Sequence, residues 1–499
     1  MYLSPLRSRI KSSYKYRLIT SRKQAVLRKS KPAYQTKPSR PEMGSPQESA
    51  VLYRNLNTRF LSLLRGRGVS LELDNGLSVI DASGGAAVAC IGHGDQRVRD
   101  AIVAQLDKVA YCSTLFYTAD VCERLCQELV SSTHGHMSRA YIVSSGSEAM
   151  EAAMKLARQY FLEKPRPEHQ RAKFIARNLS YHGTTLGALS MGGHVSRRAK
   201  FEPMLLSNVH KVSRCFAYRD QGHDETDQSY VARLADELDR EFQRLGPDTV
   251  CAFVAEPVVG AALGSVPATR GYFKAMRAVC DKYGALLILD EVMCGMGRTG
   301  TLHAWEQEDI VPDIQTLGKC LGGGYQPIAG VLVSNNVVNV LMGGSGSFVH
   351  GHTYQGHPIA CAAALEVQKI IRDEQLLQNV RKMGDLMSTK LVELLQNHPN
   401  VGNIRGRGLF WGVEFVANKA TKEPFPVAAN VAMGLAELGL TEPYKIAIYP
   451  GTGTADGVNG DHVILSPPYN ITAAEVEKIV NIMRRLVDDF FSSKAKASL

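Results

Sequence analysis

Short apolar runs alternate with helix-like segments through the middle of this chain. Between residues 85 and 335 this alternation favours an α/β fold, in which a mostly parallel sheet is covered on both faces by helices. The predicted strands lie at 141–145, 173–176, 251–255, 285–289 and 314–317, and the predicted helices lie at 147–158, at 269–283 and in a small-residue stretch ending at Met191.

Polar residues that could take part in binding or catalysis follow the predicted strands. Ser144 to Ser147, Tyr181, Glu256, Asp290 and Lys319 each come at or just after the end of an apolar run. In open parallel sheets, ligands bind beyond the carboxyl ends of the strands. We therefore expect these side chains, remote in sequence, to gather at one edge of the sheet.

Lys319 lies between the apolar run 314–317 and the glycines that precede Tyr325. An exposed lysine is protonated at neutral pH, whereas a partly desolvated lysine loses its charge and can condense with an aldehyde. Most single lysines are solvated surface charges. The apolar and glycine-rich flanks favour a Schiff-base lysine over that alternative.

The other residues at this edge suit a phosphorylated aromatic aldehyde. Ser145, Gly146 and Ser147 open a predicted helix, whose free N–H groups and dipole can hold a phosphate, although an ordinary serine N-cap is the alternative. Tyr181 can stack on a flat ring or fill the core. Asp290 can keep a ring nitrogen protonated, since the attraction is about 4 kcal/mol at about 4 Å. Together with Lys319, they predict pyridoxal 5′-phosphate.

Composition is that of a globular enzyme. The 499 residues are 44% hydrophobic and 21% charged, and a chain of this length can form more than one lobe. No apolar run reaches the roughly 18 residues of a transmembrane helix, so we expect no integral membrane association. The ten cysteines include no C-x-x-C pair, which predicts neither a zinc site nor a disulfide scaffold.

The positive net charge belongs to one end of the chain. Residues 1–41 contain 12 of the 58 Lys and Arg residues and none of the 48 Asp and Glu residues, so the remainder carries 46 basic and 48 acidic side chains. A core with net charge −2 offers no basic face for nucleic acid. The tail at 1–45 resembles a mitochondrial transit peptide, which predicts the mitochondrial matrix; a basic disordered arm on a cytoplasmic protein is the alternative.

The motifs together resemble the class III pyridoxal-phosphate-dependent aminotransferases, over residues 55 to 488. The matching segments are Ser144-Ser-Gly-Ser-Glu-Ala149, Tyr181-His-Gly183, Glu256-Pro257, Asp290-Glu-Val292 with Gly297-Arg-Thr-Gly300, Lys319, His352-Thr-Tyr-Gln-Gly-His-Pro358 and Arg405-Gly-Arg-Gly408. The resemblance implies a fold type I enzyme and a homodimer. It divides the chain into a tail (1–45), a first part of the small domain (46–90), a large cofactor domain (91–345), and a linker with the C-terminal small domain (346–499).

The resemblance also implies roles for individual residues. Lys319 would form the internal aldimine and move the proton between substrate and cofactor, and Asp290 would hold the pyridine nitrogen. Thr353 would reach the phosphate of the neighbouring subunit. The implied cofactor contacts are Ser145, Gly146, Ser147, Tyr181, His182, Asp290, Val292, Lys319 and Thr353.

Substrate contacts are implied for four residues. Arg405 would grip a substrate carboxylate, and Glu256 would pair with Arg405 when the other substrate lacks a carboxylate there. Without the resemblance, the glycines around Arg405 favour a surface turn. Phe116 and Tyr117 occupy positions that line the substrate pocket in relatives, with aromatic packing as the alternative.

Two positions depart from the family pattern. Met293 stands where many relatives carry a glutamine that contacts the ring hydroxyl, and a thioether cannot replace an amide donor. Val259 replaces a common polar residue, as in some amine-transaminase-like members. These changes favour substrates other than ornithine and 4-aminobutyrate.

The sequence predicts transamination from an amino acid or ω-amine to a 2-oxo acid such as pyruvate or 2-oxoglutarate. Decarboxylation, racemisation, internal amino transfer and phosphate elimination are alternatives on the same fold. A non-catalytic dimeric scaffold is an alternative of another class, and the presence of both Lys319 and Asp290 argues against it.

Overall fold

A computed structural model describes residues 49–58 and 60–497. The chain divides into one unit that ends at Phe60 and a second that begins at Leu61. In the first unit the rings of Tyr53 and Phe60 pack with centroids 4.9 Å apart. The predicted tail at 1–45 lies outside the described residues. All elements named below belong to the second unit.

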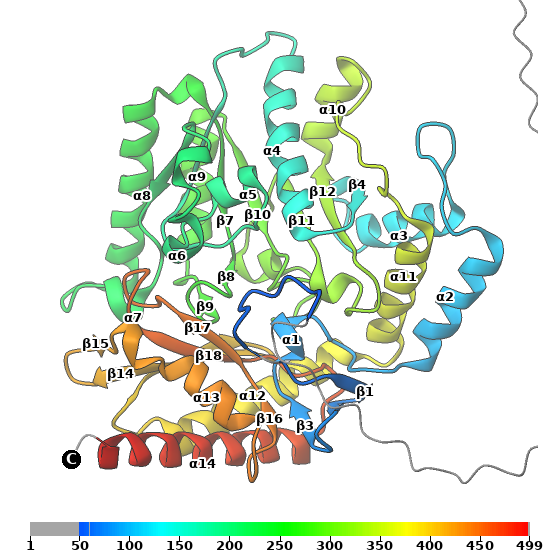
Figure 1. Ribbon diagram of the computed structural model, residues 1–499. Helices are drawn as coiled ribbons and strands as arrows, with labels where there is room; N and C mark the ends of the chain where they lie inside the picture. Colours follow the sequence, from blue (N-terminus) through cyan, green and yellow to red (C-terminus); the bar gives the residue numbers. More distant parts are fainter. Residues whose placement is uncertain (1–48, 59, 498–499) are drawn as a thin grey trace, which may run out of the picture. The chain divides into compact units, whose positions relative to one another are not determined.

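A seven-stranded sheet forms the centre of the large lobe (Figure 1). Its strands pair in parallel except β12, which runs antiparallel to both of its neighbours. In spatial order they are β4 (Met137–Val143), β12 (Ala329–Ser334), β11 (Ile314–Leu317), β10 (Leu286–Asp290), β7 (Val250–Ala255), β5 (Lys173–Arg177) and β6 (Val209–Val212).

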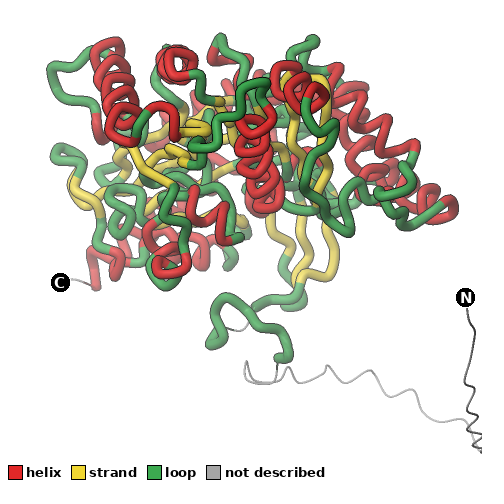
Figure 2. Tube along the Cα trace, turned by 90° about the horizontal axis from the view of Figure 1, so that it is seen from above, coloured by secondary structure: helices red, strands yellow, loops and turns green. Residues whose placement is uncertain are grey.

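Helices cover both faces of this sheet because its central strands are apolar on both sides. Val254 and Ile288 belong to the hydrophobic cluster of α4 (Gly146–Glu163) and α10 (Asn335–Gly343). Phe253 and Leu287 belong to the cluster of α8 (Asp227–Leu245) and α9 (Tyr272–Tyr283). Strands buried on both faces read as continuous apolar runs, as 251–255 does. Viewed from above, helices flank the central strands (Figure 2).

Further helices complete the large lobe and connect it to the small one. Pro358 begins α11, which packs on α2 and α3. The further helices are α2 (Gln96–Lys108), α3 (Asp120–Ser131), α5 (Leu186–Met191), α11 (Pro358–Asp373) and α12 (Leu376–Leu395). Single helical turns are α1 (Gly84–Ala87), α6 (Val195–Arg198) and α7 (Ala217–Asp220).

The small lobe combines both ends of the second unit. Strand β16 (Ile446–Ala447) pairs in parallel with β3 (Ser78–Asp81), so the C-terminal part extends the N-terminal sheet (Figure 1). The other strands are β1 (Leu63–Arg67), β2 (Ser70–Leu73), β13 (Val401–Arg407), β14 (Phe410–Asn418), β15 (Glu423–Pro424), β17 (Tyr449–Thr452) and β18 (Asp461–Leu465). The helices are α13 (Val431–Gly439) and α14 (Ala473–Ala497). A two-stranded ribbon, β8 (Val258–Val259) with β9 (Val266–Pro267), lies outside these sheets.

The α/β fold with a mostly parallel sheet is confirmed. The predicted strand 314–317 coincides with β11, and the predicted helix 269–283 begins three residues later, at Tyr272 of α9. Strands β6 and β12 were not predicted. The boundaries at residues 90 and 345 stay predictions.

In the described part of the chain, no helix is both long and apolar enough to cross a bilayer. Among the same residues no group of three or more His, Cys, Asp or Glu side chains is arranged for a metal ion. The ten cysteines are unbridged, and Cys320, beside Lys319, is buried.

Candidate active site

A cavity of about 400 Å³ lies at the carboxyl ends of β4, β5, β7, β10 and β11. The structure therefore brings together the residues that the sequence placed at one sheet edge. Its wall includes Ser144, Ser145, Gly146, Ser147, Tyr181, His182, Glu256, Asp290, Val292, Met293 and Lys319, with Val88, Gly183, Val258, Gly324, Gln326, Pro327 and Ile328. A larger hollow of about 830 Å³, between α3, α11 and α12, contains none of the predicted residues.

The N-terminus of α4 forms one wall of this cavity. The Ser145 hydroxyl accepts from Glu148 N at 3.2 Å and the Glu148 carboxylate accepts from Ser145 N, a reciprocal capping box. Ser145 is thus an N-cap, while Gly146 and Ser147 are the first helical residues. A Cβ at Gly146 would lie 2.8 Å from Val292 Cγ1. This bare helix end suits an anion.

Asp290 is held in place by three donors. Its Oδ1 accepts from Val292 N at 3.0 Å and from the Thr316 hydroxyl at 3.2 Å, and its Oδ2 contacts His182 Nδ1 at 2.8 Å. Only 4% of Asp290 is exposed. Among the described residues, no lysine or arginine lies within ion-pair distance of this carboxylate, and its side-chain neighbour there is the imidazole of His182. A buried carboxylate of this kind suits a protonated ring nitrogen.

Lys319 begins a short 3-10 turn, and Gly318 alone separates it from β11. Its φ of 45° is in the left-handed region that non-glycine residues rarely adopt, a strain that often marks functional sites. Burial lowers the pKa of Lys319 to about 8, so a substantial fraction of the amine is neutral near physiological pH.

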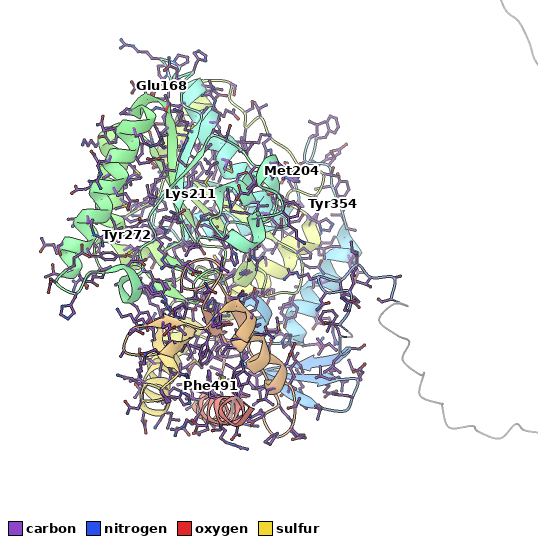
Figure 3. All side chains as sticks on the ribbon, turned by 60° about the vertical axis from the view of Figure 1, so that its left-hand side comes forward. Glu168, Met204, Lys211, Tyr272, Tyr354 and Phe491 are labelled. Atoms are coloured by element: carbon purple, nitrogen blue, oxygen red, sulfur yellow. The ribbon has the colours of Figure 1, made fainter. Side chains whose placement is uncertain are left out.

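A second lysine shows why position matters as much as pKa. Burial lowers the pKa of Lys211 to about 7, but its ammonium donates to the carbonyls of Ser190 and Met191. Lys211 does not line the cavity, and Figure 3 shows it within the large lobe. It is a structural donor.

Tyr181 and Glu256 share one side of the cavity. Tyr181 N donates to Glu256 Oε2 at 3.1 Å, and Gly260 N donates to Glu256 Oε1 at 3.2 Å. The Arg197 guanidinium lies 4.5 Å from the Tyr181 ring centroid. Burial raises the pKa of Glu256.

Three predicted residues lie in exposed loops and do not line this cavity, and Arg405 is described separately below. Phe116 is 75% exposed and Tyr117 is 69% exposed, and Thr353 is also exposed. Each lies in a loop, the first two before α3 and Thr353 before α11. Their contacts with cofactor or substrate stay predictions.

The expected pairing of Glu256 with Arg405 is not what the structure contains. Arg405 is buried outside the cavity wall and its NH1 pairs with Glu414 Oε2 at 2.6 Å. Arg405 lies within β13 and Glu414 within β14, so their proximity depends on the pairing of two strands, which the sequence pattern did not reveal. The surface turn considered for Arg405 is wrong, because this residue is buried within β13.

Sequence reasoning also missed residues that line the cavity or orient its side chains. Thr316 is paired with Asp290 in the register of β10 and β11, and its hydroxyl fixes the carboxylate. Val88 and Ile328 are single apolar residues that look like core positions in the sequence. The register of two parallel strands is the signal that would have identified Thr316.

Comparison with known proteins decides the family. Residues 52–487 match the family of class III aminotransferases. The chain belongs to the class III aminotransferases. An aminotransferase of Gibberella zeae is 52% identical over 89% of this chain and 87% of its own. An aminotransferase of Schizosaccharomyces pombe is 47% identical over 89% of this chain and 96% of its own.

Solved structures agree with this aminotransferase assignment. An (S)-enantioselective ω-transaminase from Thermomicrobium roseum superimposes with a TM-score of 0.82 at 33% identity, covering 89% of this chain and 97% of the other. An ω-transaminase from Pseudomonas jessenii, in complex with PMP, gives a TM-score of 0.83 at 31% identity, covering 90% and 97%. The protein is a fold type I transaminase that uses pyridoxal 5′-phosphate, an amino donor and an oxo-acid acceptor.

Proposed function

We propose that this aminotransferase passes an amino group from an amino acid or ω-amine to a 2-oxo acid, with Lys319 as the residue that binds the cofactor and moves the proton. The observation that carries this proposal is the shared cavity of Lys319, Asp290 and the α4 N-terminus. When bound, the cofactor supplies a conjugated ring that takes up the electron pair released at the substrate carbon.

The protein's own groups have separable tasks. The Lys319 amine, whose pKa burial lowers to about 8, can accept a proton from the substrate carbon and return it at a neighbouring atom. Asp290, oriented by Thr316, Val292 and His182, would keep the ring nitrogen protonated. Gly146 and Ser147 would hold the phosphate at the start of α4.

A half-reaction assay tests the proposal. The purified holoenzyme is offered a panel of α-amino acids, ω-amino acids and simple amines while the cofactor absorbance is followed. We expect at least one donor to convert the cofactor to its amine form with one equivalent of oxo product. A decarboxylase or racemase would instead release carbon dioxide or invert the substrate without that stoichiometric oxo product.

We also propose that the active unit is a homodimer in which Thr353 contacts the phosphate of the neighbouring subunit. Large apolar side chains are exposed around this loop and the segment before α3, which supports a covering partner. They are Tyr111, Leu115, Phe116, Tyr117 and Tyr354. Tyr354 lies at the periphery in Figure 3.

The basic tail supports a proposal about location. We propose that residues 1–45 direct the chain to the mitochondrial matrix, as their composition predicts. A rice relative, 36% identical over 82% of this chain, is named a probable mitochondrial gamma-aminobutyrate transaminase. Fusion of residues 1–45 to a fluorescent protein should deliver it to mitochondria; a uniformly cytoplasmic signal would contradict the proposal.

A further inference from the structure

Most hydrogen-bond donors of the Arg405 guanidinium already have acceptors within the protein. Its Nε donates to Gly264 O at 2.9 Å, and its NH2 donates to Leu263 O. Its NH1 donates to Glu414 Oε2 at 2.6 Å and to Asn403 Oδ1 at 3.0 Å. Four of the five N–H donors of an arginine therefore have partners.

Glu414 is a fixed counterion for Arg405. Its residue is 0% exposed, and its other oxygen, Oε1, accepts from Arg219 Nε at 2.6 Å. The Phe216 ring lies 4.7 Å from the Arg405 guanidinium carbon. Separating such a buried pair is costly because it leaves a desolvated charge without a partner. Arg405 is therefore held away from any incoming carboxylate.

The carbonyls that Arg405 contacts belong to the loop that carries Glu256. Gly264 N donates to Gly260 O at 2.8 Å, and Gly260 N donates to Glu256 Oε1 at 3.2 Å. Glu256 then lines the cavity beside Tyr181. A continuous series of hydrogen bonds thus runs from Arg405 to the cavity wall.

The loop and the small-lobe sheet approach each other very closely. A Cβ at Gly412, the strand partner of Arg405, would lie 2.1 Å from Gly264 O. The loop thus rests against bare backbone of β14 and is fastened there by the Arg405 side chain. This arrangement limits how far residues 256–264 can move.

We infer that Arg405 is a positioning residue: paired with Glu414, it fastens the loop 256–264 and so places Glu256, and it does not bind the substrate carboxylate. The inference rests on the proposed function of the cavity as the transamination site. Because Arg405 lies outside the cavity, its removal should affect reactions of substrates with and without a carboxylate equally.

Two small reagents separate positioning from carboxylate binding. Aminooxyacetate carries a carboxylate and methoxyamine does not, and both react with the cofactor held on Lys319. We would measure the rate at which each removes the cofactor absorbance band of the holoenzyme and take the ratio of the two rates. This ratio reports carboxylate recognition without requiring knowledge of the natural donor.

The variants are Arg405→Ala, Arg405→Lys and Glu414→Gln, with Arg219→Ala as the control. We expect the three test variants to slow both reagents together by roughly 10- to 100-fold, since small displacements of positioned groups have effects of this size. Their rate ratio should stay within about twofold of wild type. Arg219→Ala removes the other partner of Glu414 but no contact to the loop, so its rates should change little.

Opposite results would overturn the inference. If Arg405 binds the carboxylate directly, Arg405→Ala should slow aminooxyacetate alone, by about 30-fold or more, as truncation of one partner of a charge pair does. Glu414→Gln should then free Arg405 and speed aminooxyacetate relative to methoxyamine. Arg405→Lys, which keeps the charge but cannot reach both carbonyls, decides the matter if the alanine variant fails to fold.

Amide hydrogen exchange on the cofactor-free protein supplies a measurement independent of reactivity. We expect faster exchange at residues 260–264 in Arg405→Lys and Glu414→Gln than in wild type and Arg219→Ala. Unchanged exchange in both test variants would contradict the fastening role. Failure of the proposed function looks different: wild type itself would then lack either the absorbance band or any amino donor.

Discussion

The pKa of Lys319 determines how the rate of cofactor binding by the cofactor-free enzyme depends on pH. Burial lowers this pKa to about 8, so the neutral, nucleophilic amine increases as pH rises through about 8. An exposed lysine gains its neutral form only near pH 10.4. The reactivity of Lys319 should therefore rise at a pH about two units lower than that of an exposed lysine.

We predict that cofactor-free enzyme captures pyridoxal phosphate faster as pH rises from about 7 to 9, with a plateau above, because the fraction of neutral Lys319 follows that course. Stopped-flow absorbance measures the rate. Lys319→Met should show no such phase. A rate that keeps rising beyond pH 10 in wild type would contradict the prediction.

Removal of the Lys319 amine should abolish turnover without harming the fold. Burial already disfavours its charge, so Lys319→Met relieves a desolvation penalty in the cofactor-free protein. We expect an unchanged or higher melting temperature, measured by differential scanning fluorimetry without cofactor. A fall of many degrees would assign a structural role to the ammonium.

At the scale of elements, the capping box of α4 stabilises the helix, whereas the free N–H groups at its N-terminus are available to bind the phosphate. The Ser145 hydroxyl is occupied by Glu148 N, whereas Ser147 accepts from Thr184 N at the cavity. We predict that Ser145→Ala lowers the free energy of unfolding by about 1 kcal/mol. Ser147→Ala should instead weaken cofactor retention. Urea titration and cofactor dilution measure the two effects, and interchanged results would contradict these roles.

The contact of β14 with the loop 256–264 predicts a steric cost. Gly412→Ala places a Cβ against Gly264 O, and backbone cannot swing aside, so we expect destabilisation of about 1–3 kcal/mol. Gly343→Ala is the matched control, since no atom lies within 4 Å of its added Cβ. Denaturant unfolding compares the stabilities of the two variants. Equal stabilities would show that the loop 256–264 moves to make room for the added methyl group.

The strands and their ends were predictable because burial on both faces leaves continuous apolar runs, and parallel topology collects their carboxyl ends. This is why Lys319, Asp290 and Glu256 were placed together correctly. Strand β12 was missed although Ala329–Ser334 is also a buried apolar run, and its antiparallel direction depends on chain connections that a local pattern does not contain. The partner of Arg405 was missed for a related reason: cross-strand register is set by distant contacts.

At the scale of the whole molecule, the proposed dimer predicts complementation between two defective variants. Lys319→Ala and Thr353→Ala should each be impaired. A mixed dimer would hold one site with both residues intact, because each site takes Lys319 and Thr353 from different subunits. Random exchange should restore about a quarter of wild-type activity. Mixing after subunit exchange, followed by a transamination assay, measures this; no recovery would show that both residues act within one chain.

The pairing of β3 with β16 has a consequence for synthesis of the chain. Asp81, at the end of β3, leaves the ribosome long before its strand partner Ala447 is translated. At about 5–20 residues per second, the wait is roughly 20 to 70 seconds. During that interval the first sheet has an unpaired edge, which invites association with other nascent chains. The first sheet of the small lobe is therefore completed late in synthesis, and ribosome-bound chaperones have that time in which to act.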